Sequence, residues 1–410
     1  MFRGSLGSWD LSRAPANRYR VNAASRRFDA GLAFMITVTV ASPGQDLTAQ
    51  WNDLIRRAPG NAFMNPVALK AAFDTMFAAV YVLLAWEEGV ESARLVGLWA
   101  VQHRNVMMLW PALLEARPFN YAFLSTPVVD PAHAAEVMPA FFAAIRKNPA
   151  LPNVVSLKEM DADSRAYAAI QKTIEREQLA HLTLTRSLRP AVTREKGVKT
   201  SGSTRKKLRQ DWNRLSGLGK LELVNERTAD ATKAAFEQFL DLEKRSWKGD
   251  KGTAILCSER DTGFTRRLIG DLAAEGNASV ALLRLDGRVV AAQVLMYCGT
   301  TAFTWKIAFD AEFAKYSPGV LLVDKMTEQL FTVTDVQAID SCSAQDSFMA
   351  QIWTGRKTMV DMVVDVSPAR SLVFGMEAAR QYGYERLRDL RDWLRATSLI
   401  PAKRKFAPTP

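Results

Sequence analysis

Cysteine and histidine are scarce in this chain, which has three of each among 410 residues. Cys257, Cys298 and Cys342 are far apart and odd in number, so they predict no disulfide framework and fit a reducing cytoplasm. The histidines are scattered, and no Cys-x-x-Cys pair occurs. These absences argue against a His/Cys metal site, and we expect no metal.

Long hydrophobic runs are also missing. No uninterrupted apolar stretch approaches the roughly 20 residues that a membrane-spanning helix needs. Hydrophobic residues make up 48% of the chain and charged residues 24%, which is ordinary for a globular protein. The length allows two or three domains with a sizeable core. We therefore expect a cytoplasmic protein without a transmembrane segment.

Acidic residues are fewer than basic ones, which gives a net charge of +11 and favours an anionic partner. Basic residues gather between Lys196 and Lys220, where eight lysines and arginines stand against Glu195 and Asp211. This stretch fits a solvated helix face, a patch for coenzyme phosphates or a patch for a polyanionic acceptor. It lacks the aromatic interleaving typical of single-strand binding, so nucleic acid is the least favoured partner.

The two ends of the chain predict disorder, at residues 1–34 and 401–410. The first 34 residues resemble a transit peptide only in being rich in arginine and poor in acids. Met35 directly precedes a convincing strand, so a later translation start is an equally open explanation.

The first half, residues 35–190, alternates strand and helix signals. Two-residue periodicity predicts strands, and three-to-four-residue periodicity predicts helices. The expected strands are Ile36–Val40, Val80–Trp86, Arg94–Gln102, Val106–Trp110, Val154–Leu157 and Ala180–Leu184, and the expected helices are Ala49–Ala58, Pro66–Phe77, Pro131–Arg146 and Ala162–Glu177. This alternation predicts an α/β unit around one sheet. The polar stretch Arg186–Ser203 is typical of a connector.

The second half, residues 200–397, repeats the theme with a hairpin at Asp286-Gly287. The expected helices are 203–217, Asp230–Arg245, Thr262–Ala274, Pro318–Thr332, Asp346–Trp353 and Met376–Thr397, and the expected strands are Leu221–Asn225, Ser279–Leu285, Arg288–Cys298, Thr301–Phe309, Ala338–Ser341 and Met359–Val366. Two helices, antiparallel strands, a further helix and a further strand follow one another in this order.

The segment Phe303–Leu322 carries the clearest functional signal. An apolar strand ends at Phe309, a loop holds Asp310 and Glu312, and Ser317-Pro318-Gly319 opens an apolar helix. Proline suits the first helical position, serine can cap the helix, and glycine lets a ligand approach the backbone. A strand that runs into free helical N–H groups favours phosphate or pyrophosphate binding. The alternative is an ordinary strand–loop–helix connection.

The order of the motifs around this segment resembles the CelD-like acetyltransferases of the GNAT superfamily, relatives of the Fem-type peptidyltransferases. The resemblance is good over residues 200–365 and weaker over 46–190. Met349 and Ala350 stand where many relatives have a Tyr-Lys pair, so no role of that lysine can be carried over. The matching pieces are Leu242-Glu243, Ser246-Trp247-Lys248-Gly249, Gly252-Thr253, Asp286-Gly287, Asp310, Ser317-Pro318-Gly319, Leu322 and Asp340.

The resemblance implies two tandem GNAT-like units, each a mixed central sheet flanked by helices, with the acyl donor in the second unit. It implies an N-acyltransferase that uses acetyl-CoA or another acyl-CoA and acts on a small amine or an envelope or polysaccharide precursor. Two alternatives remain open. One is Fem-like transfer from aminoacyl-tRNA, and the other is a catalytically silent fold used for binding.

The resemblance also places the donor and the reacting groups. It puts the reaction in a gap between two strands, Phe303–Phe309 and Ala338–Ser341. The predicted coenzyme-binding residues are Phe309, Ser317, Pro318, Gly319 and Val320. The catalytic candidates are Asp310, Asp340 and Tyr316, although a turn or cap role for Asp310 and a packing role for Tyr316 are the alternatives.

Trp247, Lys248 and Trp305 are the predicted acceptor-binding residues, although a core aromatic is the alternative for Trp247 and a solvated side chain is the alternative for Lys248. Trp305 and Lys306 alternate on one strand, so only one of them is expected to face the site. No histidine lies near Cys342 in the sequence to activate its thiol. We therefore expect an inert Cys342 and direct attack of the amine on the thioester, rather than an acyl-enzyme.

Overall fold

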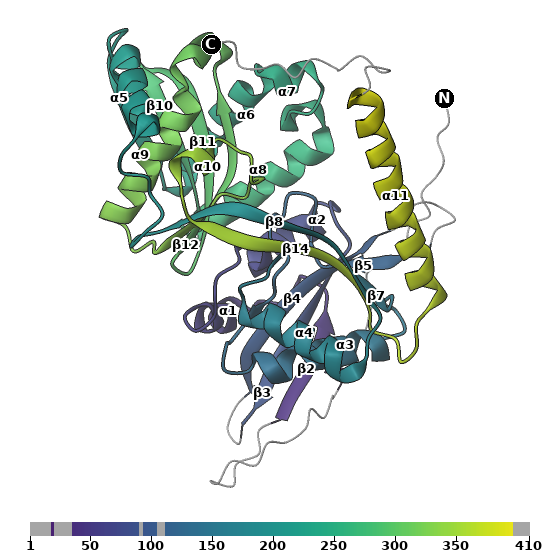
Figure 1. Cartoon of the computed structure of the whole chain (residues 1–410). Coiled ribbons are helices and arrows are strands. Elements are labelled where there is room, and N and C mark those ends of the chain that lie inside the picture. Colours follow the sequence, from purple (N-terminus) through teal and green to yellow (C-terminus); the bar gives the residue numbers. More distant parts are fainter. Residues whose placement is uncertain (1–17, 20–34, 90–92, 105–110, 397–410) are drawn as a thin grey trace.

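The computed structural model describes residues 18–19, 35–89, 93–104 and 111–396. The predicted strand Val106–Trp110 and almost all of the two predicted disordered ends lie outside this part. In it the chain forms one continuous 14-stranded mixed sheet with helices packed against it, and no described helix is long and apolar enough to cross a membrane. The predicted α/β class, a mixed sheet flanked by helices, is confirmed (Figure 1).

The N-terminal half contains the expected alternation of elements. Its amphipathic helices bury their apolar faces against the sheet, which is why their periodicity predicts them well. Its strands are β1 (Arg18–Tyr19), β2 (Met35–Ala41), β3 (Val80–Glu88), β4 (Ala93–Arg104), β5 (Leu113–Glu115), β6 (Val128–Val129) and β7 (Val154–Asp161), and its helices are α1 (Thr48–Ile55), α2 (Pro66–Asp74), α3 (Ala134–Lys147) and α4 (Arg165–Glu177).

The C-terminal half follows the predicted order closely. Asp286 and Gly287 both have positive φ, at 48° and 80°, and they form the predicted hairpin turn. The strands of this half are β9 (Leu221–Glu226), β10 (Ala278–Leu285), β11 (Arg288–Cys298), β12 (Thr301–Phe309) and β13 (Ala338–Asp340), and the helices are α5 (Ser203–Ser216), α6 (Ala229–Lys244), α7 (Trp247–Asp250), α8 (Glu259–Ala274), α9 (Pro318–Val333) and α10 (Met349–Ile352).

Two long strands run between the halves, and one of them corrects the sequence analysis. The predicted connector Arg186–Ser203 is strand as far as Thr193, because β8 spans His181–Thr193. It pairs with β14 (Arg356–Asp365) along most of its length and with β13 at its end. Its start matches the predicted strand Ala180–Leu184, but from Arg186 on the sequence lacks the apolar alternation that marks a strand. Backbone pairing on both edges makes it a strand.

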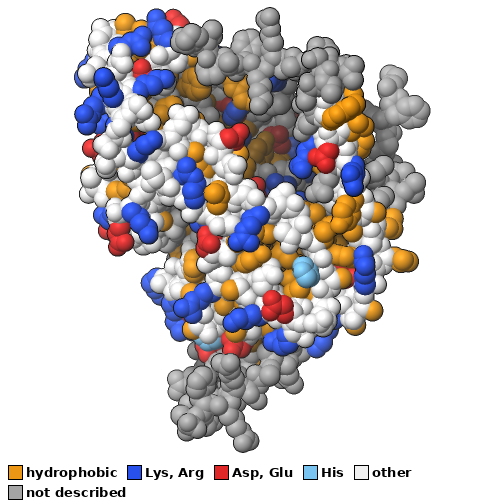
Figure 2. All heavy atoms as spheres, in the orientation of Figure 1, with side chains coloured by type: hydrophobic (Ala, Val, Ile, Leu, Met, Phe, Trp, Pro, Cys, Tyr) orange, Lys and Arg blue, Asp and Glu red, His pale blue; other side chains and the backbone are white. Residues whose placement is uncertain are grey.

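Two further helices differ from the prediction. Only Met349–Ile352 of the predicted helix Asp346–Trp353 is helical, as the short α10. The final helix, α11 (Leu372–Ala396), begins before the predicted Met376 and stands at the side of the molecule. The surface is hollowed between α11 and the C-terminal half, with hydrophobic and acidic side chains at the base of the hollow (Figure 2).

Aromatic side chains join the two halves. The Phe63 ring of the N-terminal half lies 5.8 Å from Phe303 of β12, and Phe77 stacks on Phe264 of α8 at 4.1 Å. Gly60 packs against the end of β11, where a Cβ would lie 2.3 Å from the Cys298 carbonyl oxygen. These contacts are closely packed, and they fix one face of β12 against the N-terminal half.

Candidate active site

Strands β12 and β13 separate in the second half of the chain. They pair in parallel only over Thr301–Phe303 and Ala338–Asp340. Beyond Phe303, β12 continues to Phe309 with no partner on that edge within the described residues. The Thr304 hydroxyl donates to the backbone oxygens of Asp340 (3.2 Å) and Ser341 (2.8 Å) at the point of separation. The gap that the resemblance implies is present.

A β-bulge lies just beyond this point. The pairing of β12 with β11 shifts register so that Trp305 has no opposing residue. As a result both Trp305 and Lys306 reach Tyr121 of the N-terminal half, with the Trp305 ring 5.9 Å and the Lys306 Nζ 4.8 Å from its ring. A bulge interrupts the alternation of a strand, so Trp305 and Lys306 can both contact this side of β12.

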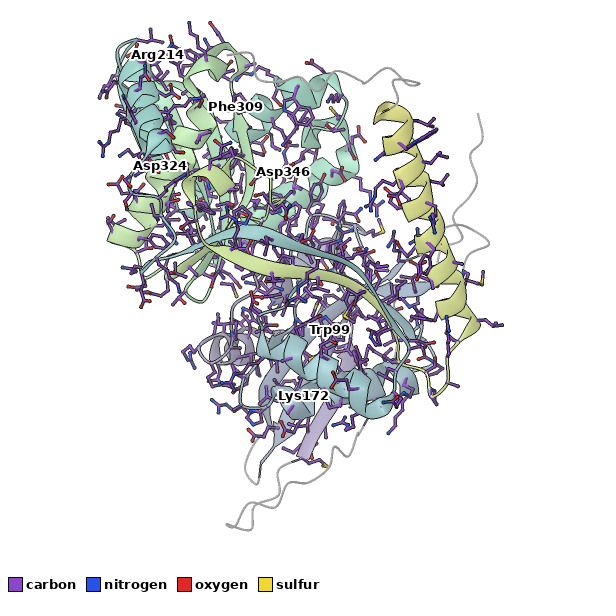
Figure 3. All side chains as sticks on the ribbon, viewed as in Figure 1. Trp99, Lys172, Arg214, Phe309, Asp324 and Asp346 are labelled. Atoms are coloured by element: carbon purple, nitrogen blue, oxygen red, sulfur yellow. The ribbon has the colours of Figure 1, made fainter. Side chains whose placement is uncertain are left out.

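The far end of β12 meets the start of α9. Pro318 occupies the first turn as predicted, but Ser317 is left-handed (φ 53°) and makes no side-chain cap. The Val320 and Leu321 N–H groups donate to the Ser317 carbonyl oxygen, so within the described residues only the Gly319 N–H of this turn has no acceptor. Phe309, labelled in Figure 3, is 37% exposed, and a Cβ on Gly319 would lie 3.4 Å from its ring. One free N–H and the helix dipole therefore face this end of the gap.

Asp310 and Tyr316 lie at the α9 end of the site. Asp310 accepts from the Glu312 N–H (3.0 Å) and from Arg288 (2.7 Å). Burial raises the pKa of Asp310, but Arg288 and the Glu312 N–H outweigh it and the net shift is downward. The Tyr316 side chain is buried in the core around α9. The strand from Phe303 to Asp310 spans about 20 Å, so the structure does not bring Asp310 together with Asp340.

Asp340 lies at the other end, in a buried charge cluster built by four strands. Its side chain is 1% exposed and accepts from the Cys342 N–H (2.8 Å), Arg189 (3.4 Å) and Lys357 (3.4 Å). Arg189 also pairs with Glu159, and Lys357 with Asp161. Burial raises the pKa of Asp340, but the two cations and the N–H bring it below its usual range. Asp340 is therefore an ionised carboxylate and a weak base.

A second buried carboxylate lies on the α6 side of β12. Glu243 is fully buried and accepts from Lys248 (2.8 Å) and the Ile255 N–H (3.0 Å), and its Oε1 lies 3.7 Å from the Lys306 Nζ. Burial lowers the pKa of Lys306, although Glu243 acts in the opposite direction. Trp247 is 56% exposed at the nearby surface. Of the predicted acceptor residues, the structure gathers Lys248 and Trp305 around this cluster.

Several residues of these clusters were not among the sequence candidates. Glu243 interrupts an apolar helix face, a signal that could have singled it out. Arg189, Lys357 and Tyr121 carry no such signal, because their partners come from distant segments. Within the described residues, no group of three or more His, Cys, Asp or Glu side chains could hold a metal ion.

The three thiols should differ sharply in reactivity. Burial raises the pKa of Cys342 well above its usual value and that of Cys298 to about 12, whereas Cys257 is exposed. Because the thiolate is the reacting species, we expect one thiol of the native protein to react with a thiol reagent near neutral pH and all three after unfolding. Cys257→Ser should abolish the fast reaction. A fast-reacting Cys342 would contradict the expectation of an inert thiol.

Comparison with known proteins identifies the fold. Residues 202–348 match the family described as acetyltransferase (GNAT) domain. The crystal structure of FemX is similar, with a TM-score of 0.53 and 11% identity over 76% of this chain and 95% of that chain. L-PGS from Bacillus licheniformis has a TM-score of 0.46 and 14% identity, over 80% and 94% of the two chains. No curated protein sequence matches significantly. Residues 202–348 therefore match a GNAT domain, and the fold of the chain is like that of FemX.

Proposed function

We propose that the protein is an acyl-CoA-dependent N-acyltransferase that acts on a small amine. The separation of β12 from β13, which leads into the start of α9, is the observation that carries this proposal. The unpaired edge of β12 from Thr304 to Phe309 offers backbone groups to the amides of the pantetheine arm. The Gly319 N–H and the α9 dipole would then meet the pyrophosphate. Acetyl-CoA is the simplest donor.

In this arrangement the thioester lies near the Trp305 bulge and Asp340. The acceptor amine attacks the thioester carbonyl, so that a C–N bond forms and the C–S bond breaks. The proton lost by the amine passes to the departing thiolate. A backbone N–H at the bulge can polarise the carbonyl oxygen. The ionised Asp340 can hold the amino group, whereas Asp310 and Tyr316 lie at the coenzyme end and shape the start of α9.

The resemblance to CelD-like proteins supports an envelope or polysaccharide precursor as one class of acceptor. Three free cysteines, two of them buried, support a reducing compartment such as the cytoplasm. Trp247 and Lys248 remain candidates for the acceptor pocket on the α6 side, and the cluster around Asp340 is a second candidate.

Gly319→Asp should abolish coenzyme binding while the fold survives. A Cβ on Gly319 would lie 3.4 Å from Phe309, so the aspartate would place its charge beside the unpaired edge of β12. An acidic residue in the first helical turn is itself compatible with helix formation. Coenzyme A at 100 times its dissociation constant should stabilise the wild type by about 2.7 kcal/mol in a thermal-shift measurement.

Gly319→Ala is the matched control, because its methyl group fits at ordinary contact distance. It should keep most of the shift produced by coenzyme A, whereas Gly319→Asp should show none. Equal thermal shifts by coenzyme A in the two variants would show that the coenzyme does not bind at the start of α9.

Fem-like transfer from aminoacyl-tRNA is the second candidate, and two observations favour it. The fold is like that of FemX. The basic helix α5 lies beside α9, where Arg205 pairs with Asp324 and Arg214 lies 5.3 Å from the Tyr316 ring. Arg214 and Asp324 mark this edge in Figure 3. Tight binding that depends on aminoacylation of the tRNA, with no shift by acyl-CoA, would favour this candidate.

A further inference from the structure

A cavity of about 300 Å³ lies between the two halves, next to the separation of β12 and β13. Residues of β8, β13 and β14 form one wall, and loops of the N-terminal half with the start of α4 form the other. Asp340 lines this cavity. Its backbone also pairs with Phe303, the last residue of β12 before the gap. The cavity therefore reaches the same carboxylate as the proposed thioester site.

Most of the cavity wall is apolar. Leu124 and Val129 line it from the N-terminal half, and Val192 and Ile339 line it from β8 and β13. All four side chains are buried. A ligand held here would lose water from an apolar body of roughly amino-acid size, which is a favourable contribution to binding.

The acidic side chains of the cavity are already engaged by the protein. Asp161 and Asp340 both pair with Lys357, at 3.2 and 3.4 Å. Asp163 accepts from the Thr358 N–H at 3.1 Å. Asp340 Oδ2 nevertheless has capacity left, because a carboxylate oxygen accepts two hydrogen bonds and Lys357 is its one donor among the described residues. It can accept from an amino group inside the cavity.

Two basic side chains of the cavity, unlike its acidic ones, are not engaged in ion pairs within the described residues. Lys196 and Arg165 line the cavity with exposed side chains, and within the described residues neither has an ion pair. A ligand anion would find two charges here that no carboxylate of the described residues neutralises.

We propose that this cavity binds the acceptor, and that the acceptor is a small amine with an apolar body and a carboxylate, such as an apolar amino acid. This inference rests on the proposed function. The carboxylate binds at Lys196 and Arg165, the apolar body fills the cavity, and the amino group meets Asp340. Attack on the thioester forms the N–C bond and breaks the C–S bond, giving an N-acyl amino acid and free coenzyme A, with the proton passing to the thiolate.

The test uses the full chain with acetyl-CoA and two probes, L-leucine and L-leucinamide. The double variant Lys196→Met with Arg165→Met should raise KM for L-leucine about tenfold or more, because a charged hydrogen bond is lost, and should leave KM for L-leucinamide unchanged. Ala338→Phe, which places a ring in the cavity from β13, should raise KM for both probes. Lys147→Met removes an exposed lysine outside the cavity and is the matched control.

Coenzyme binding separates failure of this inference from failure of the proposed function. If acetyl-CoA fails to stabilise the wild type, the proposed function is wrong. If acetyl-CoA binds to every variant but L-leucine is not acylated, or is acylated equally well by the cavity variants, the acceptor assignment is overturned. The acceptor assignment is also overturned if KM for L-leucine rises in Trp247→Ala but in none of the cavity variants, because the acceptor would then bind on the α6 side.

Discussion

Asp340→Asn should lower turnover about 100-fold, because the amino group loses the carboxylate that holds it for attack, and should destabilise the protein by about 3 kcal/mol. The substitution leaves Arg189 and Lys357 buried beside a neutral amide. Removal of one partner from a buried ion pair typically costs about 3 to 5 kcal/mol. We expect the lower value here, because Arg189 keeps Glu159 as a partner and Lys357 keeps Asp161. Urea unfolding and steady-state kinetics on the folded protein measure the two effects.

The pH dependence of stability gives this prediction a second readout. The pKa of Asp340 is lower in the folded state than in the unfolded state. Its contribution to the free energy of unfolding is therefore fully present above the unfolded-state pKa of about 4, and it is lost as the pH falls through the folded-state pKa. The wild type should therefore lose its advantage over Asp340→Asn in acid. Adding Lys357→Met removes one stranded cation and should recover part of the stability but none of the turnover. Full recovery of turnover would make Asp340 purely structural.

The sequence predicts the elements of this fold better than the contacts between them. Helix α6 and strands β10 to β12 have strong periodicity and a recognisable hairpin, so they lie within a few residues of their predicted bounds. Strand β8 carries a strand signal only at its start, in the predicted Ala180–Leu184. From Arg186 to Thr193 it has no such signal, and pairing on both edges makes this part a strand.

The candidate site divides in the same way. The start of α9 could be located because proline and glycine have fixed positional preferences. The bulge at Trp305 could not, because it depends on the register against β11. The Asp340 cluster needs four strands from both halves, and no local pattern reports such long-range pairing.

Glu243→Gln should destabilise the protein by about 3 to 5 kcal/mol near neutral pH. Glu243 is fully buried and compensates the largely buried ammonium group of Lys306. Lys248 is 25% exposed and can turn to water after the substitution, but Lys306 is 15% exposed and largely cannot. Equilibrium unfolding in urea measures the loss.

The stability lost in Glu243→Gln should be smaller in alkaline solution. The direction of this pH dependence follows from the pKa of Lys306. Its folded-state pKa is below the unfolded value of about 10.4, so the unfolded chain binds more protons between the two values and stability rises with pH there. Without Glu243 the folded-state pKa of Lys306 falls further, so the pH range in which stability rises with pH extends to lower pH.

Lys306→Met provides the matched partner for Glu243→Gln. The double variant carries neither charge and should recover much of the stability that Glu243→Gln loses, as replacement of a whole buried pair often does. Its stability should also lose the alkaline rise assigned to Lys306. If the double variant is no more stable than Glu243→Gln and keeps the same pH profile, the pair does not act as a unit. The stability of this face of β12 would then come from the aromatic contacts with Tyr121 instead.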